Sequence, residues 1–187
     1  AEAVIRKQCG EILGDVVQRP NIPPGTAFKY APPAWLSYTS PEMQAVLRDV
    51  VESTFYVSQT GSVEMPKALD GRSVAIGGGI YRMGIGGLHS SEQSQAMVSD
   101  EDYVLIDRDV TSYYPAIILN CNLSPLHLTR ENAFLRVYRS IVERRVEAKK
   151  RGDDVTATVL KITANGSFGK LGSKYSALYS PHLMIQV

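Results

Sequence analysis

The sequence lacks a cysteine pattern and a targeting or membrane-spanning segment, either of which would narrow its function. It contains only two cysteines, Cys9 and Cys121, and they show neither the spacing of a zinc site nor a disulfide framework. A reducing compartment is the default expectation for such a chain. The sequence also lacks a signal-peptide pattern and an apolar run long enough to span a bilayer. We therefore expect an intracellular protein that does not enter a membrane.

The sequence also lacks an excess of one charge. The formal net charge is +1, so overall charge alone does not indicate a nucleic-acid-binding protein. The distribution of charge is more informative. Residues 130–174 contain 11 Lys or Arg against 5 Asp or Glu, whereas residues 1–100 contain 8 against 10. A basic block beside a nearly neutral remainder is what a phosphate-binding lobe requires.

The first half of the chain predicts short elements separated by prolines and glycines. Residues 1–19 predict a short helix, and the five prolines in residues 20–38 predict an extended path. Ser40-Pro41 is typical of a helix start, with an N-cap residue followed by proline at the first helical position. Residues 55–83 alternate short apolar runs with Gly and Pro, which predicts strands joined by turns.

The second half predicts a helical hairpin between strands. Tyr103–Ile106 predicts a short apolar strand. The spacing of apolar residues predicts one long helix from about residue 129 to 150 and a second one ending near Phe168, with a tight turn at residues 151–154. Residues 175–187 predict a returning strand. Such a hairpin would stand on a sheet.

Asp109 is the first candidate for chemistry. A carboxylate that follows an apolar strand lies at the edge of a sheet, where it can bind a hard cation. Asp107 would share the same strand face. Most aspartates at strand ends cap turns instead, and this alternative stays open. Two adjacent tyrosines, Tyr113 and Tyr114, follow; they would serve either as packing residues or as rings beneath the sugar of a bound triphosphate.

The predicted hairpin carries the second candidate group. Arg145 and Lys149 are four residues apart on the first helix, and Lys161 and Asn165 are four apart on the second. Antiparallel pairing would bring three cations and an amide together on a wall suited to a triphosphate. The alternative is a solvated basic face.

Glycine-rich segments and two further lysines complete the set of candidates. Lys170 and Lys174, flanked by glycines, would either contact a nucleic-acid backbone or belong to a flexible surface loop. The glycine runs at residues 77–79 and 84–87 are not followed by Lys-Ser or Lys-Thr, which excludes a P-loop.

Two of these segments, taken in order, resemble the catalytic motifs of family B DNA polymerases. Asp109-Val-Thr-Ser-Tyr-Tyr-Pro115 resembles the first motif, Asp-x-x-Ser-Leu-Tyr-Pro. Lys161-Ile-Thr-Ala-Asn165-Gly-Ser-Phe168-Gly169 resembles the second, Lys-x-x-x-Asn-Ser-x-Tyr-Gly. The short hairpin between them and the segment Gly84–Ser90 are similar to phage-type members. The resemblance covers residues 75–187 well and residues 1–75 only vaguely.

The resemblance implies a role for each matching residue. Asp109 would bind the catalytic metal together with the backbone carbonyl of Val110. Ser112 and Tyr114 would contact the nucleotide, and the Tyr114 ring would exclude the 2′-hydroxyl of a ribonucleotide. Arg145, Lys149 and Lys161 would bind the triphosphate, and Asn165 would support the site. Phe168 and Gly169 would form the floor beneath the new base pair. Lys170 and Lys174 would contact DNA. Because Arg144 and Lys150 are adjacent, the register on the first helix stays open.

The resemblance also implies an activity and a fold. The activity would be template-directed addition of deoxynucleotides to a primer 3′ end with two Mg²⁺ ions. The partners of the protein would be primer–template DNA, deoxynucleoside triphosphates and the rest of the polymerase chain, and no membrane would be involved. If the gene belongs to a phage, the protein would act in the cytoplasm of a bacterial host. The expected α+β fold comprises a mixed N-terminal segment (1–95), a partial antiparallel palm sheet (96–129), a two-helix fingers hairpin (130–169) and a return to the palm (170–187).

The sequence departs from the family pattern at several points. Tyr113 stands where Leu is usual, Gly166 replaces a Ser, and Phe168 replaces a Tyr. The third motif of the family, Tyr-x-Asp-Thr-Asp, does not occur in the chain. We therefore expect a fragment of a longer polymerase that is inactive by itself. The alternative is a non-catalytic nucleic-acid-binding module with a basic helical hairpin.

Overall fold

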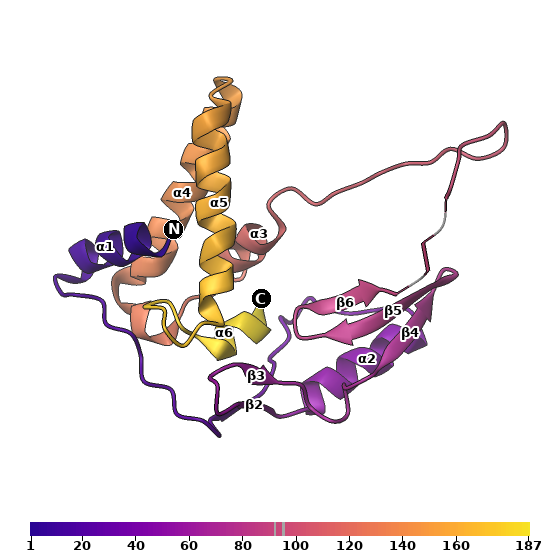
Figure 1. Cartoon of the computed structure of the whole chain (residues 1–187), viewed down its shortest axis with the longest axis horizontal. Helices are drawn as coiled ribbons and strands as arrows, with labels where there is room; N and C mark the ends of the chain where they lie inside the picture. The colour runs from indigo at the N-terminus through magenta and orange to yellow at the C-terminus, as the bar shows by residue number, and fades with distance from the viewer. Residues whose placement is uncertain (92, 95) are drawn as a thin grey trace.

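The computed structural model describes residues 1–91, 93–94 and 96–187, and within them the chain is an α+β protein. These residues form six α-helices and two three-stranded antiparallel sheets. Figure 1 shows a helical region built around a tall hairpin and a smaller region in which one helix covers strands. The α+β class expected from the sequence is confirmed.

The N-terminal elements follow the predicted pattern. Helix α1 (Glu2–Leu13) is followed by an irregular path that contains only the two-residue strand β1 (Ala27–Phe28). Helix α2 (Pro41–Glu52) begins as the sequence indicates, with proline in its first turn. The Ser40 hydroxyl caps α2 by accepting a hydrogen bond of 3.2 Å from the Met43 amide.

The strands predicted for residues 55–83 are confirmed, and they form two small sheets. The first sheet has the order β1-β2-β3 and the second β4-β5-β6. Their further strands are β2 (Phe55–Val57), β3 (Val63–Glu64), β4 (Ser73–Ile76), β5 (Gly79–Gly84) and β6 (Gly87–Ser90). Gly77 and Gly78 form the two-residue turn between β4 and β5, and both have positive φ, a backbone conformation that suits glycine.

The predicted helical hairpin is present. It consists of α4 (Ala133–Lys150) and α5 (Asp154–Leu171), which pack side by side and are joined by a tight turn. Gly152 enters the turn with φ +71°. The Asp153 carboxylate then caps α5 by accepting a 3.0 Å hydrogen bond from the Thr156 amide.

The main hydrophobic core lies at the base of this hairpin, between α4, α5 and α1. Phe134, Tyr138 and Ile141 are buried, as the apolar stripe of α4 predicts, whereas Val146 near the tip is 46% exposed. The Tyr138 hydroxyl donates a 3.1 Å hydrogen bond to the Ala164 carbonyl, which fixes the register of the two helices. The core therefore holds the base of the hairpin and leaves its tip in solvent.

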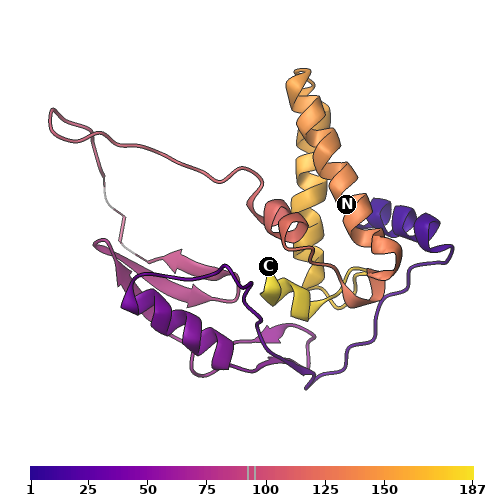
Figure 2. The same ribbon diagram turned by 180° about the vertical axis from the view of Figure 1, so that it is seen from behind.

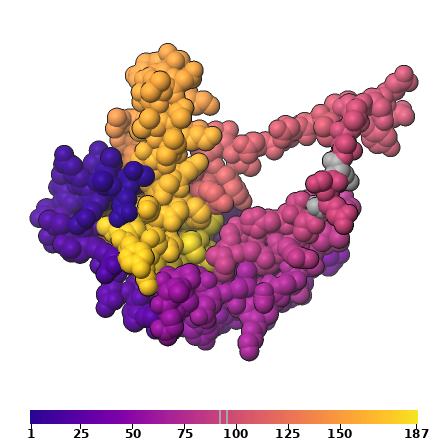
Figure 3. Space-filling view, viewed as in Figure 1, coloured from indigo at the N-terminus to yellow at the C-terminus, as the bar shows by residue number. Residues whose placement is uncertain are grey.

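The strand predicted at Tyr103–Ile106 is wrong. Residues 103–110 have no regular structure, and all of them are exposed. They belong to a segment of residues 96–112, called the arm below, that projects away from the rest of the molecule (Figures 1 and 3). A strand requires the backbone of a neighbouring strand, and no other described segment pairs with this one.

The returning strand predicted at residues 175–187 is also wrong, because the chain ends in helix α6 (Pro181–Gln186). Ser180-Pro181 places proline in the first turn of α6, as Pro41 does in α2, although the Ser180 side chain makes no capping hydrogen bond; this proline signal is visible in the sequence. Helix α3 (Tyr113–Asn120) precedes the hairpin. The hairpin is thus flanked by helices, and the expectation that it stands between strands on a sheet is wrong. None of the helices described is both long and apolar enough to cross a membrane.

Candidate functional site

The two sequence motifs meet where α3 lies against α5. Tyr114, in the first turn of α3, stacks on Phe168 of α5 with the ring centroids 4.2 Å apart and the ring planes 8° from parallel. Tyr113 lies beside this pair, with its centroid 5.8 Å from that of Tyr114 and 56% of its surface exposed. An aromatic pair with one open neighbour can receive the flat face of another ring.

A second contact joins the same two regions from α4. The Arg145 guanidinium donates a hydrogen bond from Nη1 to the Ser112 hydroxyl, the residue that precedes α3. Ser112 has φ +54°, a left-handed conformation that is uncommon for residues other than glycine. The Arg145 Nε is buried and has no hydrogen-bond partner among the residues described. Arg145 thus combines one hydrogen bond to Ser112 with a buried donor that no described residue satisfies.

Helical spacing groups the other candidate residues on one stripe of each hairpin helix. Lys161, Asn165 and Phe168 follow the i, i+4, i+7 pattern, so all three share one stripe of α5. Arg145 and Lys149 share a stripe of α4 in the same way. Helix α3 packs against both hairpin helices, as Figure 2 shows, and each stripe contacts the start of α3 through one residue, Arg145 from α4 and Phe168 from α5.

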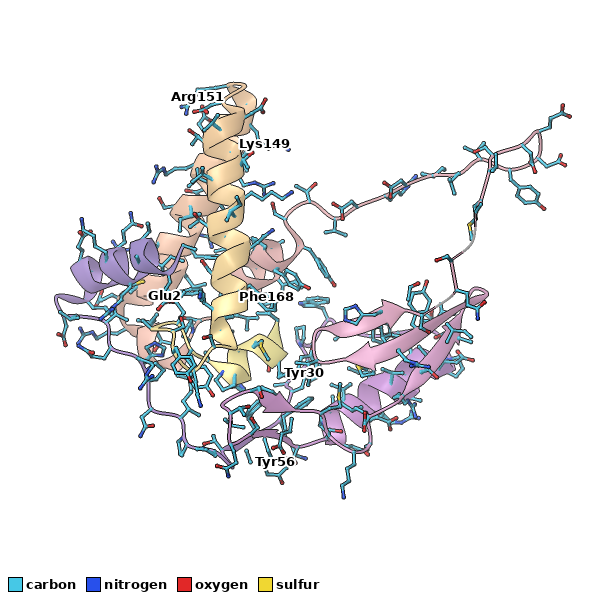
Figure 4. The ribbon with its side chains drawn as sticks, in the orientation of Figure 1. Glu2, Tyr30, Tyr56, Lys149, Arg151 and Phe168 are labelled. Atoms are coloured by element: carbon cyan, nitrogen blue, oxygen red, sulfur yellow. The ribbon has the colours of Figure 1, made fainter. Side chains whose placement is uncertain are left out.

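The register of the hairpin sets the separation of the cations. The contact between Tyr138 and Ala164 places Arg145 about one helical turn, or ~6 Å, farther from the base than Lys161. Packed helices lie roughly 8–10 Å apart, a span that long Arg and Lys side chains can bridge through a shared ligand. Lys149 is exposed near the tip of the hairpin (Figure 4), and Lys161 and Asn165 are exposed as well.

Asp109 and Val110 lie on the arm and are exposed. No group of three or more His, Cys, Asp or Glu side chains that could hold a metal ion occurs in the part of the chain that the structure describes. The donor chemistry nevertheless fits Mg²⁺, because this ion is usually bound through one or two carboxylates, waters and substrate phosphates. Both residues lie in the last part of the arm, within four residues of the start of α3.

The two lysines predicted to contact DNA occupy different environments. Lys170 is exposed near the end of α5, beside α1. Lys174 is half-buried, and its ammonium group lies 5.4 Å from the centroid of the Tyr175 ring. Its aliphatic stem packs over Gly61, where a methyl group would come within 2.8 Å of it. Lys174 therefore helps to join the β2–β3 turn to the helical region, a role that the sequence did not indicate.

A cleft of about 410 Å³ lies next to the stacked rings, between the β-rich region and the helices. Tyr114 and Phe168 form part of its wall, and four of the five methionines of the chain line it: Met43, Met65, Met83 and Met184. Methionine side chains adapt to the shape of what they contact. These residues are scattered along the sequence, so no local pattern could have predicted the cleft.

Tyrosines supply the polar edge of the cleft. Tyr30 and Tyr38 line it, and Figure 4 shows Tyr30 on the side of the β-rich region that faces the helices. Burial raises the pKa of the Tyr30 phenol, with smaller contributions from Tyr38, Cys121 and Tyr113. The cleft is thus an apolar cavity with hydroxyl donors at its rim, the usual composition of a small-molecule site.

Comparison of the chain with protein-family models, with curated proteins and with solved structures finds no match.

Proposed function

We propose that this chain forms the deoxynucleotide-binding part of a DNA polymerase of the family B type. The observation that carries the proposal is the stack of Tyr114 on Phe168, because it joins the aromatic residues of two motifs that are far apart in the sequence. The hydrogen bond between Arg145 and Ser112 supports it independently. Both contacts link residues that the resemblance assigns to one site.

In this proposal each part of a nucleotide meets suitable chemistry. The triphosphate binds along the stripes that carry Arg145, Lys149 and Lys161, since guanidinium and ammonium groups form charge-assisted hydrogen bonds to phosphate. The sugar and base lie against the aromatic pair, and Tyr114 excludes the 2′-hydroxyl by steric contact. Asn165, Phe168 and Gly169 complete the floor of the site. Ser112 holds Arg145 until the phosphates replace it.

Catalysis by such a site rests on positioning and on neutralising the charge of the phosphates. Magnesium supplies part of this neutralisation when bound, and Asp109 and the Val110 carbonyl are its proposed protein ligands. Arg145 and Lys161 hold the phosphate oxygens in a fixed direction relative to the sugar. Lys170 and Lys174 are the proposed contacts to the DNA backbone, with primer–template DNA as the partner.

A nucleic-acid-binding module without catalytic function is the second candidate. It is favoured by the number of exposed cations on the hairpin, which are Arg136, Arg139, Arg144, Lys149, Lys150, Arg151, Lys161 and Lys170. Binding of free nucleotides separates the two candidates. The polymerase site requires binding of free deoxynucleoside triphosphates, whereas the module requires only a charged surface for a polyanion.

The proposal is tested by calorimetric titration of the chain with dATP, with and without Mg²⁺. Arg145→Ala and Lys161→Ala should each weaken binding by ~10- to 100-fold, because each removes charge-assisted hydrogen bonds worth roughly 1.5–3 kcal/mol. Arg144→Ala is the matched control, since Arg144 is adjacent but exposed and should leave the affinity unchanged. Equal effects of Arg144→Ala and Arg145→Ala, or no binding of dATP by the folded chain, would overturn the proposal.

A further inference from the structure

The hydrogen bond between Arg145 and Ser112 satisfies the guanidinium group only in part. Its Nη1 donates to the Ser112 hydroxyl, whereas its Nε is buried and has no hydrogen-bond partner among the described residues. A buried donor without a partner destabilises the conformation that buries it. A ligand with several charged acceptor oxygens would give the guanidinium group a better set of partners.

The conformation of Ser112 is also unfavourable. Its φ of +54° and ψ of +50° lie in the left-handed region, which residues other than glycine rarely adopt. Serine at the start of a helix commonly caps it, but the Ser112 side chain makes no capping hydrogen bond to α3. Pro115, the third residue of α3, has no amide hydrogen and removes one of the donors that a cap would bind. The Ser112 hydroxyl is therefore left to accept from Arg145.

The direction of the Arg145 side chain explains how it reaches Ser112. Helical side chains lean toward the N-terminus of their helix, which for α4 is the base of the hairpin. Arg145 therefore extends toward the start of α3, where Tyr114 stacks on Phe168. In the part of the chain that the structure describes, it is the one α4 side chain that forms a hydrogen bond with residues 111–120.

We propose that the Ser112 hydroxyl is an autoinhibitory latch, which holds Arg145 until the phosphates of a bound triphosphate displace it. The inference rests on the proposed nucleotide site. A hydroxyl that binds the nucleotide would raise the affinity of the site, whereas a hydroxyl that competes for Arg145 lowers it. The apparent affinity falls with the fraction of molecules in which Arg145 is free to bind the phosphates.

Calorimetric titration of three variants with dATP tests the latch. Ser112→Ala and Ser112→Gly both remove the hydroxyl, and glycine in addition suits the left-handed backbone. Both variants should bind dATP about three- to tenfold more tightly than the unaltered chain, because Arg145 no longer loses a hydrogen bond when the phosphates arrive. Thr111→Ala is the matched control, since it removes an exposed hydroxyl next to Ser112 and should leave the affinity unchanged.

Removal of Arg145 supplies a second test. In a chain that already carries Arg145→Ala, the hydroxyl has no guanidinium group to hold, so Ser112→Ala should change the affinity for dATP by less than about twofold. NMR of the chain without nucleotide gives a readout that does not depend on binding. The side-chain nitrogen signals of Arg145 should show restricted rotation of the guanidinium group in the unaltered chain and free rotation in Ser112→Ala.

Each contrary result has a distinct meaning. Weaker binding of dATP by both Ser112 variants would overturn the inference, because the hydroxyl would then be a contact to the nucleotide. Tighter binding by Ser112→Gly alone would assign the effect to the backbone. An equal effect of Ser112→Ala with and without Arg145 would show that the hydroxyl acts on another group.

The titration also separates this inference from the proposed function. Unchanged affinity in both Ser112 variants would overturn the latch and leave the nucleotide site standing. Failure of the unaltered chain and of every variant to bind dATP would overturn both.

Discussion

Tyr114 and Phe168 stack with their ring centroids 4.2 Å apart, although one belongs to the segment before the helical hairpin and the other to its second helix. This contact gives the proposed site an aromatic wall. It also orients the Tyr114 ring, because a stacked ring cannot turn freely about its side-chain bonds. A fixed ring is what steric selection between sugars requires.

The first prediction concerns this selection. Tyr114→Ala should reduce the preference of the chain for dATP over ATP, because the ring that contacts a 2′-hydroxyl is lost. The measurement is the ratio of the two dissociation constants, determined by calorimetry. Tyr113→Ala is the matched control, since Tyr113 is adjacent and more exposed. If Tyr113→Ala removes the preference and Tyr114→Ala does not, the register of the motif is wrong by one residue.

The second prediction concerns the stability of the hairpin. Tyr138→Phe removes the hydroxyl that donates to the Ala164 carbonyl inside the core. The free energy of unfolding should fall by about 1–2 kcal/mol, because a buried hydrogen bond between the two helices is lost. Denaturation in urea measures this loss. Tyr56→Phe, at a half-exposed tyrosine on the other side of the molecule (Figure 4), should change stability by less than ~0.5 kcal/mol.

The third prediction concerns pH. Hydrogen bonds from Thr156 lower the pKa of the Asp153 carboxyl, so the carboxylate stabilises the folded state at pH values above its ordinary pKa. This contribution should disappear as the pH falls through the lowered pKa of the folded state, below about pH 4. Asp153→Asn, which keeps a capping side chain but cannot ionise, should show less loss of thermal stability between pH 6 and pH 3 than the unaltered chain. If Asp153→Asn and the unaltered chain lose the same thermal stability between pH 6 and pH 3, the Asp153 cap does not contribute to the pH dependence of folding.

The fourth prediction separates general attraction of a polyanion from specific binding. Single-stranded DNA should bind the basic hairpin with an affinity that falls as salt rises. Lys149→Ala should weaken this binding and lower the salt dependence by about one released ion. Glu143→Ala is the control: it removes a negative charge from the same helix, so it should strengthen the binding of DNA. Binding that does not depend on salt would contradict an electrostatic interface.

The sequence was sufficient to predict elements that are specified locally. The start of α2 at Ser40-Pro41 and the turn between α4 and α5 follow from caps, prolines and glycines within a few residues. The α+β class follows from the same signals. These predictions succeed because the residues that cause each helix start or turn lie within a few positions of it in the sequence.

Predictions that depend on distant partners failed. Tyr103–Ile106 has the composition of a strand, but composition does not supply a neighbouring strand. The strand predicted at residues 175–187 failed for a different reason, since the local signal of Ser180-Pro181 favours a helix start there, as Ser40-Pro41 does in α2. The methionine-lined cleft was beyond prediction, since its walls come from segments throughout the chain.

Photo-cross-linking with 8-azido-dATP tests most directly whether the two motifs form one deoxynucleotide site. The labelled chain is digested and the modified peptides are identified by mass spectrometry. We expect labelling within Tyr113–Pro115 and Asn165–Gly169, and unlabelled dATP should suppress it. Labelling confined to other segments, such as α1 or the hairpin tip, would contradict the claim.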